Sequence, residues 1–380
     1  MIDSRLQHLL ETPNLRILAI VRDHISGMLY AVPNLRTLRK QFPNAHITLM
    51  ANPYGMPILK GCPYIDEMIP FFQFRRKRSD RIKGLWTKFQ AWMKLVGRVD
   101  LVVNIRWVGP ETLAFTTTLG KPYQVAYSQD KWDHLIDLNI GSEDLINDTT
   151  IERNARVIEA MGFPLDSEDL EIWLDPSDVA WANDFLTKHG WREGEPLFAI
   201  HAGSHWGCNE WLPERWSALA NGLLARYGGH ILLTGTERER PLTTKIAKNI
   251  AGPVVNAAGH TDIPRFATLL NAATMVIAVD TAPTQICQAL NKTAVILMGS
   301  GNMTWLGKEF PDNLTILQDN ETADVHNPHC QFGAGTCHSQ FCRSNLANIQ
   351  LGHVMRAVSK QMAQAEGPRV ALLPPLVYEV

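Results

Sequence analysis

The sequence predicts an α/β protein with two parallel-sheet domains, and three observations support this fold class. The chain has 380 residues, which exceeds the usual size of one hydrophobic core. Short apolar runs alternate with helix-like segments in both halves, which is typical of parallel sheets with helical crossovers. An acidic, proline-containing stretch at residues 164–178 indicates a linker. We therefore expect an N-terminal domain over residues 1–175, a second domain over 176–350, and a C-terminal helix and tail over 351–380.

The expected strands are short and strongly apolar. They comprise residues 16–22, 45–51 and 101–105 in the first half, and 197–201, 229–234, 254–256, 275–279 and 293–298 in the second. Helices are expected through 33–38 after a turn of small residues around Ser26 and Gly27, over 75–99 with a basic face, over 147–162, and from about Pro213. Neither half contains the G-x-G-x-x-G turn of dinucleotide-binding domains, which argues against a dehydrogenase.

The composition is that of a globular protein. Apolar residues make up 45% of the chain and charged residues 19%, and the formal net charge is -2, which argues against a disordered or general nucleic-acid-binding protein. The N-terminus lacks a basic segment followed by an apolar run, and no stretch approaches the ~18 apolar residues of a membrane span. We therefore expect a soluble, cytoplasmic protein.

Small and polar residues follow three strands of the second half, at the edge where open parallel sheets bind ligands. The first loop contains Gly203 and Ser204, whose small size lets the backbone approach a phosphate. The second offers Thr236 and Glu237 to a ribose or base, and the third offers Asp280 beside a diphosphate. Each loop also has a purely structural interpretation: an ordinary turn, a solvated acid at a helix start, and a helix N-cap.

The order and spacing of these loops resemble the glycosyltransferase family 9 heptosyltransferases over nearly the whole chain. The matching segments include CPYIDEMIPF, ERNARVIEAMGFP, HAGSHWGCNEWLPERW, VVNAAGHTDIPRFATLLNAATMVIAVDTAP and the late cysteine region. The resemblance implies a GT-B fold with two Rossmann-like domains facing a central cleft. It also implies an inverting glycosyltransferase that needs no metal for its chemistry. Such an enzyme moves a heptose-like sugar from a nucleotide donor, ADP-heptose, to a hydroxyl of a lipopolysaccharide core or another surface glycan.

The resemblance also implies which residues bind the donor. The positions that match the family's grip on the phosphates and sugar are Gly203, Ser204, Asp280, Thr281, Ala282 and Gln285. Thr236 and Glu237 lie near the expected nucleoside contact. Two positions depart from the family pattern, since Asn209 replaces the usual lysine before the tryptophan-proline pair, and Gln285 replaces the usual histidine. The lysine replacement removes one positive charge that would face the diphosphate.

A third departure affects the expected general base. The family has a serine-serine-x-glycine-aspartate loop after the first strand, and alignment on Pro33 puts Gly27 at the place of that aspartate. Glycine cannot accept a proton, so another group must act, or transfer is slow, or activity is lost. Asp23 and His24 in the same loop are the nearest substitutes, although a lone aspartate or histidine in a turn is more often a cap or a surface residue.

A basic and aromatic segment in the first half predicts the acceptor side. The segment contains Arg75, Arg76 and Arg78, and the aromatic residues on the same expected helix are Trp86, Phe89 and Trp92. Arg106, which follows the expected strand at 101–105, is the fourth arginine assigned to the acceptor. This combination suits an anionic glycolipid or glycan, with peripheral contact at the inner face of the cytoplasmic membrane. The alternative is an ordinary solvated helix face.

The late cysteine region and the lost family residues leave further alternatives open. Cys330, Cys337 and Cys342, with His329 or His326 as a fourth ligand, are suited to a structural zinc or iron ion, although buried or free thiols are the better explanation. Some family relatives that modify autotransporters have such cysteines, so a protein O-heptosyltransferase is one alternative function. A noncatalytic sugar-nucleotide-binding or scaffold protein is another, because the family aspartate and lysine are both missing.

Overall fold

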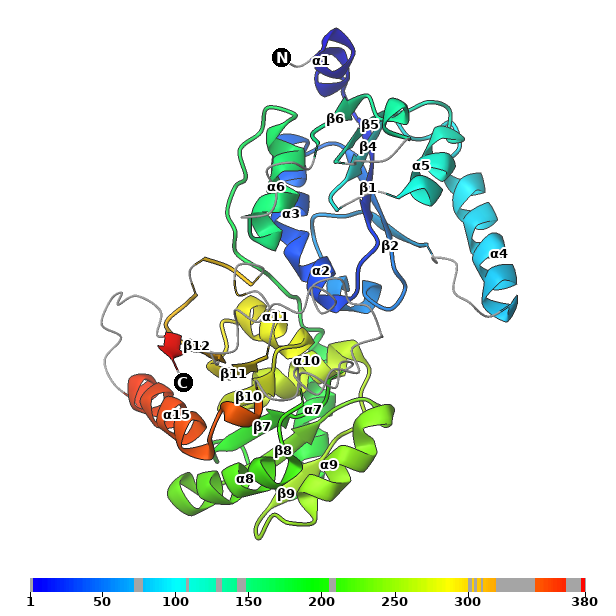
Figure 1. The fold of residues 1–380 in the computed structure, drawn as a ribbon. Coiled ribbons are helices and arrows are strands. Elements are labelled where there is room, and N and C mark those ends of the chain that lie inside the picture. The colour runs from blue at the N-terminus through cyan, green and yellow to red at the C-terminus, as the bar shows by residue number, and fades with distance from the viewer. Residues whose placement is uncertain are drawn as a thin grey trace. The chain divides into compact units, whose positions relative to one another are not determined.

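The computed structural model describes most of the chain in two compact units. The described residues are 3–71, 78–106, 109–127, 132–141, 148–204, 210–299, 303, 306–308, 310–318, 346–366 and 377–379. The first unit comprises Met1–Trp173 with Thr304–Gly307, and the second comprises Leu174–Met303 with Lys308–Val380. Figure 1 shows that each unit contains its own sheet and its own helices.

The first unit is built on a six-stranded parallel sheet with the order β3-β2-β1-β4-β5-β6. Its strands are β1 (Arg16–Val21), β2 (His46–Ala51), β3 (Glu67–Pro70), β4 (Leu101–Asn104), β5 (Tyr123–Ala126) and β6 (Leu138–Asn139). The chain proceeds from β1 outward to β3 and then returns to β4 on the other side of β1. The carboxyl ends of β1 and β4 therefore flank the topological switch point, where ligands bind to such sheets.

Helices cover both faces of this sheet. They are α1 (Ser4–Leu10), α2 (Ile25–Tyr30), α3 (Val32–Gln41), α4 (Arg78–Leu95), α5 (Pro110–Thr117) and α6 (Thr150–Glu159), with short 3-10 turns η1 (Met56–Leu59) and η2 (Asp133–Leu135). Leu18, Ile20 and Val102 of the sheet pack with Ala91 and Leu95 of α4. The α3 and α6 helices pack together, and Asn34 of α3 donates to the Asn154 carbonyl at 2.6 Å.

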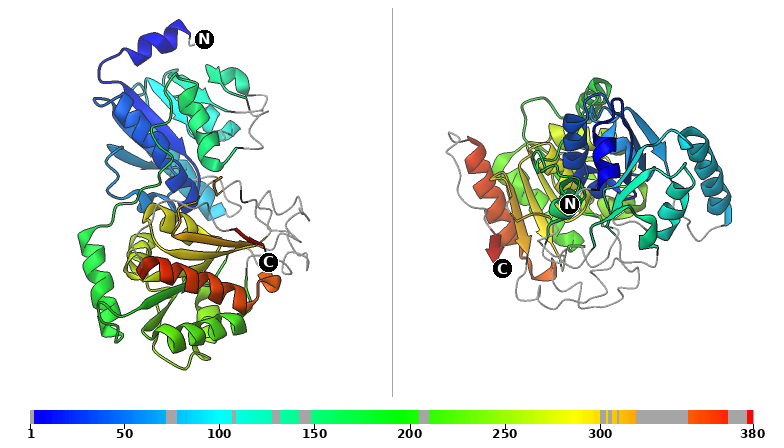
Figure 2. Two further views of the ribbon diagram at one scale, coloured as in Figure 1. Left: turned by 90° about the vertical axis from the view of Figure 1, so that its left-hand side faces the viewer. Right: turned by 90° about the horizontal axis from the view of Figure 1, so that it is seen from above.

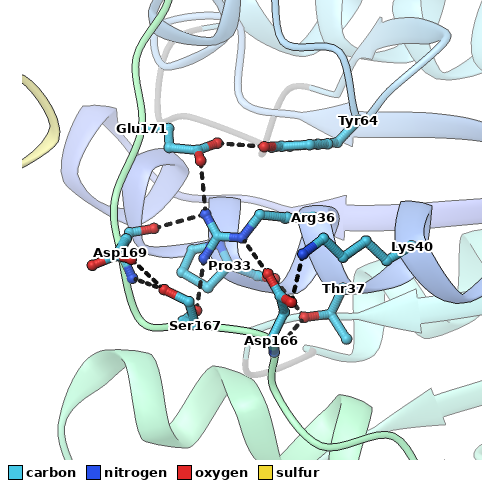
Figure 3. A network of polar contacts seen from close by, with 9 residues as sticks. All are labelled: Pro33, Arg36, Thr37, Lys40, Tyr64, Asp166, Ser167, Asp169 and Glu171. Atoms are coloured by element: carbon cyan, nitrogen blue, oxygen red, sulfur yellow. Dashed lines mark hydrogen bonds and ion pairs between the residues drawn. The ribbon is translucent and has the colours of Figure 1, made fainter.

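The segment after α6 is tied to α3 by a buried arginine (Figure 3). Arg36 is 5% exposed. Its Nε lies 3.1 Å from Asp166 Oδ2, its Nη2 donates to the Ser167 carbonyl at 2.8 Å, and its Nη1 lies 3.1 Å from Glu171 Oε1. The Tyr64 hydroxyl donates to the other oxygen of Glu171 at 2.6 Å. One side chain thus fixes the extended chain that leads toward the end of the first unit.

The second unit is built on a seven-stranded parallel sheet with the order β13-β12-β11-β10-β7-β8-β9. Its strands are β7 (Leu197–His201), β8 (His230–Thr234), β9 (Val254–Asn256), β10 (Met275–Val279), β11 (Ala294–Met298), β12 (Leu314–Gln318) and β13 (Val377–Glu379). The chain passes from β7 outward to β9 and returns to β10 on the other side of β7. The second switch point therefore lies between β7 and β10.

Helices also cover both faces of the second sheet (Figure 2). They are α7 (Pro176–Lys188), α8 (Pro213–Tyr227), α9 (Arg240–Ala247), α10 (Ile263–Ala272), α11 (Ala282–Ala289) and α15 (Leu351–Glu366), with the 3-10 turn η5 (Glu237–Glu239). The core on one face joins Phe198, Ile200 and Trp216 to Val354 and Val358. The α15 helix thus packs against α8 as part of this unit.

Most predicted elements are confirmed, and one is wrong. The strands expected at 197–201, 254–256 and 275–279 have the predicted bounds, and α8 begins at Pro213. The turn expected around Ser26 and Gly27 is instead helical, because α2 begins at Ile25 directly after the extended residue His24. Gly27 lies buried in this helix beneath the side chain of Asp23.

No helix within the described part of the chain is long and apolar enough to cross a membrane.

Candidate functional site

The carboxyl end of β7 carries a buried histidine that the sequence patterns did not single out. His201 is the last residue of β7, and its Nδ1 lies 3.0 Å from Thr234 Oγ1 at the end of β8. Because the Thr234 hydroxyl donates to the Ile200 carbonyl, Nδ1 of His201 is the donor to Thr234. Burial lowers the pKa of His201, against the opposing effect of the Glu239 charge. A neutral imidazole therefore links the ends of two strands.

The Glu239 side chain lies beside Gly203 of the first donor loop. Its Oε2 accepts hydrogen bonds from the backbone N–H and the hydroxyl of Thr236 at 2.6 and 2.8 Å. A Cβ added at Gly203 would lie 2.4 Å from Glu239 Cδ, and one added at Gly235 would lie 3.2 Å from Glu239 Cβ. In this conformation the Glu239 side chain occupies the space beside Gly203 that a Cβ would fill. The sequence signal was the Thr-x-x-Glu capping box at 236–239, which also engages the hydroxyl of Thr236.

The helix that follows β10 begins at the switch point, where Thr281 and Ala282 are partly buried and Pro283 is buried. Thr281 is the N-cap of α11, but its hydroxyl donates backward to the Val279 carbonyl at 3.3 Å. Within the described residues, the Thr281 side chain therefore does not cap the helix, contrary to one interpretation of the sequence. Ala282 is the first helical residue, and Pro283 stabilises the first turn. This arrangement suits an anion at the helix N-terminus.

Asp280 lies between β10 and α11, and its carboxyl titrates unusually. Its Oδ1 accepts a long hydrogen bond of 3.4 Å from the Thr284 hydroxyl. Burial raises the pKa of Asp280 from its ordinary 3.8 to about 6, although the hydrogen bond from Thr284 opposes the shift. Near neutral pH a small change of environment can therefore protonate this side chain, and an anionic diphosphate beside it would favour the protonated form.

We expect Asp280→Asn to remove a pH dependence of stability. Between about pH 4 and pH 6 the folded protein holds a proton that the unfolded chain has released, so the free energy of unfolding falls as the pH rises. Above pH 6 the variant should be more stable by at most about 3 kcal/mol, and less because Asp280 keeps some solvent access. At pH 3.5 the two proteins should be equally stable. Urea unfolding at several pH values measures this, and a difference that does not change with pH would contradict it.

The remaining donor-side predictions lie in different surroundings. Glu237 is 71% exposed, and its Oε1 lies 3.6 Å from Arg240 Nη1. Gln285 is buried in the first half of α11, and Ser204 is buried at the end of the first loop. Asn209 lies outside the described residues. The structure therefore brings Gly203, Ser204 and Glu239 together at one edge, with Asp280, Thr281 and Ala282 at the neighbouring strand end.

The switch point of the first sheet carries an ion pair. Asp23 follows β1 and Arg106 follows β4, and Arg106 Nη1 lies 2.8 Å from Asp23 Oδ2. The backbone N–H of His24 donates to Asp23 Oδ1 at 2.9 Å. The His24 side chain is exposed and makes no cap hydrogen bond as the N-cap of α2, as far as the described residues extend. Asp23 and Arg106 are about equally exposed, at 32% and 35% of their side chains.

Two further cations lie near this edge. Arg22 Nη1 donates to Thr112 Oγ1 at 2.7 Å, and its buried Nε donates to no acceptor in the described structure. Burial lowers the pKa of Arg22. Lys88 of α4 pairs with Glu111, while burial and then the positive charge of Arg22 lower the pKa of Lys88 to about 8. A pKa of about 8 leaves Lys88 mostly charged at neutral pH, and an arginine side chain remains a cation at that pH.

The α4 helix lies at the periphery of the first unit (Figures 1 and 2), and one of its faces is apolar and exposed. Leu85, Trp86, Phe89 and Met93 are each between 48% and 60% exposed, and the rings of Phe89 and Trp92 stack at 6.3 Å. Of the predicted acceptor arginines, Arg75 and Arg76 lie outside the described residues. Arg78 begins α4, but its side chain is also outside them.

The predicted metal ligands Cys330, Cys337, Cys342 and His329 lie outside the described residues. Within the described ranges, no group of three or more His, Cys, Asp or Glu side chains is arranged to hold a metal ion. Cys62 and Cys287 are buried free thiols, and burial raises the pKa of each to about 12. They are therefore protonated and unsuited to act as nucleophiles.

Both units thus have parallel sheets with polar groups at a switch point, the architecture of nucleotide-dependent α/β enzymes. A family model described as Glycosyltransferase family 9 (heptosyltransferase) matches residues 114–331. Lipopolysaccharide heptosyltransferase 3 of Escherichia coli is 23% identical over 283 residues, or 72% of this chain and 80% of that protein.

Solved structures agree with this match. A glycosyl transferase family 9 protein from Veillonella parvula has a TM-score of 0.76 at 18% identity, over 93% of this chain and 99% of that chain. Escherichia coli heptosyltransferase WaaC, solved with ADP-2-deoxy-2-fluoro heptose, has a TM-score of 0.66 at 16% identity, over 91% and 99%. Since the family model covers more than half of the chain, the chain belongs to glycosyltransferase family 9 and has the GT-B fold.

Proposed function

We propose that this chain transfers a heptose-like sugar from ADP-heptose to a hydroxyl of a lipopolysaccharide core or another surface glycan. The observation that carries the proposal is the N-terminus of α11, where Thr281 and Ala282 are only partly buried, at the switch point of the second sheet in a chain of the heptosyltransferase family. A helix N-terminus stabilises a diphosphate both when it binds and when it leaves. The related WaaC was solved with an ADP-linked fluoro heptose, which supports the choice of donor.

We propose contacts for each part of the donor. The first-turn N–H groups of α11 would hold the diphosphate, with Thr281 and Ala282 at the helix start. Asp280, protonated when the diphosphate is bound, would donate a hydrogen bond to it. Gly203 and Ser204 would approach the donor through their backbone. We propose Thr236 and Glu237 as contacts of the nucleoside, and Asn209 and Gln285 as contacts of the phosphates or sugar.

The acceptor would bind in the first domain, which we propose spans residues 1–175. Arg106, Arg22 and Lys88 supply positive charge near the carboxyl ends of β1 and β4, which favours an anionic glycan. We add Arg75 and Arg76, which precede α4 in the sequence, and Arg78, its first residue, as further contacts. Transfer would proceed with inversion by direct attack of the acceptor oxygen on the anomeric carbon.

Calorimetric titration with ADP-heptose, ADP and UDP-glucose tests the donor assignment, and mass spectrometry then tests transfer to lipopolysaccharide cores of different heptose content. We expect ADP-heptose to bind most tightly and to give a product larger by one heptose. Absence of binding by any nucleotide sugar would exclude the donor site. Tight binding without release of ADP would favour the noncatalytic alternative, which the glycine at position 27 suggests.

The exposed face of α4 would contact an anionic membrane at which such acceptors are found. We expect the double variant Trp86→Ser and Phe89→Ser to bind phosphatidylglycerol-containing vesicles about tenfold more weakly, because two aromatic side chains no longer enter the interface. Thermal stability should change little, since both side chains are exposed. Leu212→Ser, which removes an exposed apolar group in the second unit, is the matched control. Equal vesicle binding by the wild type, the double variant and Leu212→Ser would exclude a membrane contact of α4.

A further inference from the structure

We infer that Asp23 is the general base of the transfer reaction and that its carboxylate replaces the one that Gly27 cannot supply. This inference rests on the proposed function and adds the residue that removes the proton from the acceptor. Three features of the first unit carry it: the space around Gly27, the ion pair with Arg106, and the support of the loop by Gly55.

The Asp23 side chain fills the space that a side chain at position 27 would occupy. A Cβ added at Gly27 would lie 2.2 Å from Asp23 Cβ and 2.3 Å from both Asp23 Cγ and Asp23 Oδ2. These separations are far below van der Waals contact, so the two positions cannot both carry a side chain in this conformation. The Asp23 carboxylate, which comes from one helical turn earlier in the chain, therefore lies at the Cβ position of residue 27.

The Asp23 carboxylate is both oriented and accessible. Arg106 Nη1 contacts Oδ2 at 2.8 Å from the neighbouring strand end, and the His24 N–H donates to Oδ1 at 2.9 Å. These two contacts fix the plane of the carboxylate at the switch point of the first sheet. Since 32% of the Asp23 side chain is exposed, an acceptor hydroxyl can reach it. Each ionised carboxylate oxygen can also accept more than one hydrogen bond.

The backbone of the loop is held in place by a close contact. A Cβ added at Gly55 would lie 3.1 Å from the Asp23 carbonyl oxygen, 3.2 Å from the His24 carbonyl carbon and 2.7 Å from Met28 Cγ. The absence of a side chain at Gly55 lets the start of η1 pack directly against the loop. Such support keeps a catalytic group in its reactive position.

Asp23 is favoured over His24 for this role by the same geometry. The His24 side chain is exposed at the N-cap of α2, whereas Asp23 lies against Gly27 and pairs with Arg106. Arg106 is then a positioning residue that orients the carboxylate.

The reaction balances without any further reagent. Asp23 accepts the proton of the acceptor hydroxyl as that oxygen forms a bond to the anomeric carbon of the donor sugar. The bond between the anomeric carbon and the diphosphate oxygen breaks, and ADP leaves with the electron pair. The proton ends on the Asp23 carboxyl group and passes to water when the products leave.

The first test compares Asp23→Asn with the wild type, using ADP-heptose as donor and the lipopolysaccharide core that the wild type modifies best. We expect kcat to fall about 10²- to 10⁴-fold, the usual contribution of a general base, while the affinity for ADP-heptose measured by calorimetry stays within threefold. Asp184→Asn, which removes an exposed ion-paired carboxylate of α7, should leave both quantities unchanged. Arg106→Gln should lower kcat, and Arg106→Lys should restore much of it.

The second test moves the carboxylate back to position 27. The swap needs glycine at position 23, because Asp23 Cβ itself lies 2.2 Å from the Cβ position of residue 27. We expect Asp23→Gly to be inactive, Gly27→Asp to be inactive or poorly folded, and the double variant Asp23→Gly with Gly27→Asp to recover at least tenfold over Asp23→Gly. If the double variant folds and binds ADP-heptose but is no more active than Asp23→Gly, the carboxylate of Asp23 does not replace one at position 27.

The outcomes separate this inference from the proposed function. If the wild type transfers heptose and Asp23→Asn retains more than a third of its kcat, the inference is overturned while the proposed function stands. Loss of kcat in His24→Ala but not in Asp23→Asn would assign the role to His24 and also overturn it. A wild type that binds ADP-heptose without turnover on any core would overturn both the transferase function and the base.

Discussion

Arg36→Met is expected to destabilise the first unit by about 2–4 kcal/mol. The substitution keeps a long side chain but removes the guanidinium that contacts the carboxylates of Asp166 and Glu171 and the carbonyl oxygens of Ser167 and Asp169 (Figure 3). Loss of one partner of a buried ion pair leaves the other charges without compensation, which usually costs about 3–5 kcal/mol. We expect a smaller value because Asp166 and Glu171 are 28% and 35% exposed and can be hydrated.

Asp166 has a second, exposed partner, Lys40, which provides a matched control. Lys40 Nζ contacts Asp166 Oδ1 at 2.6 Å, but 58% of its side chain is exposed. Lys40→Met should therefore cost less than about 1 kcal/mol. Urea unfolding gives both values. Equal effects of the two substitutions would show that burial of Arg36 contributes nothing.

The Arg36 substitution also separates the two units functionally. The proposed donor site lies in the second unit, which has its own core, so ADP-heptose should bind with nearly unchanged affinity. Turnover should decrease as the first unit unfolds, because the loop with Asp23 and the segment held by Arg36 belong to the same unit. Parallel loss of donor affinity would indicate that the units do not unfold separately.

The sequence predicts long apolar strands well and short or unusual elements poorly. Strands β7 and β10 are continuous buried runs of five residues, so their apolar pattern alone defined their bounds. Strand β3 contains Glu67 and Pro70 and is only partly buried, which hides it from such a pattern. Helix α2 was missed because Ser26 and Gly27 are typical of turns. Its close packing against Gly55 overrides that local preference.

The candidate site was predictable in position but only partly in residues. Asp23, Arg106, Asp280 and Thr281 follow strand ends, and the alternation of strands and helices was enough to locate them. Glu239 was missed because its role depends on the space above Gly203. The relation between Asp23 and Gly27 is likewise invisible in the sequence, since it depends on the distance between atoms one helical turn apart.

Trp216→Ala is expected to destabilise the second unit by about 3–5 kcal/mol and to lower its Tm by roughly 10 °C. Trp216 is fully buried in the first part of α8, and its ring packs edge-on against Trp211 with centroids 4.9 Å apart. Trp211 Nε1 donates to the Ile349 carbonyl at 2.9 Å, which ties the start of α8 to the chain before α15. Alanine would leave a cavity beside this contact.

Trp216→Phe is the matched control for this prediction. The indole Nε1 of Trp216 is buried and has no hydrogen-bond acceptor among the described residues, so phenylalanine loses volume but no hydrogen bond. We expect the phenylalanine variant to lose about 1–2 kcal/mol, clearly less than the alanine variant. A similar loss in both variants, measured by scanning calorimetry, would point to a hydrogen bond of the indole and contradict the cavity argument.

The functional consequence follows from the position of α8 directly after the first donor loop. Trp211 and Trp216 hold the start of this helix against the core, and the loop that contains Gly203 and Ser204 ends there. A cavity at Trp216 gives the start of α8 more freedom, so donor binding must then restrict a larger set of conformations. We therefore expect Trp216→Ala to weaken ADP-heptose binding about tenfold even below its Tm, whereas Arg36→Met should not. If Arg36→Met weakened ADP-heptose binding more than Trp216→Ala, the donor would be held mainly by the first unit.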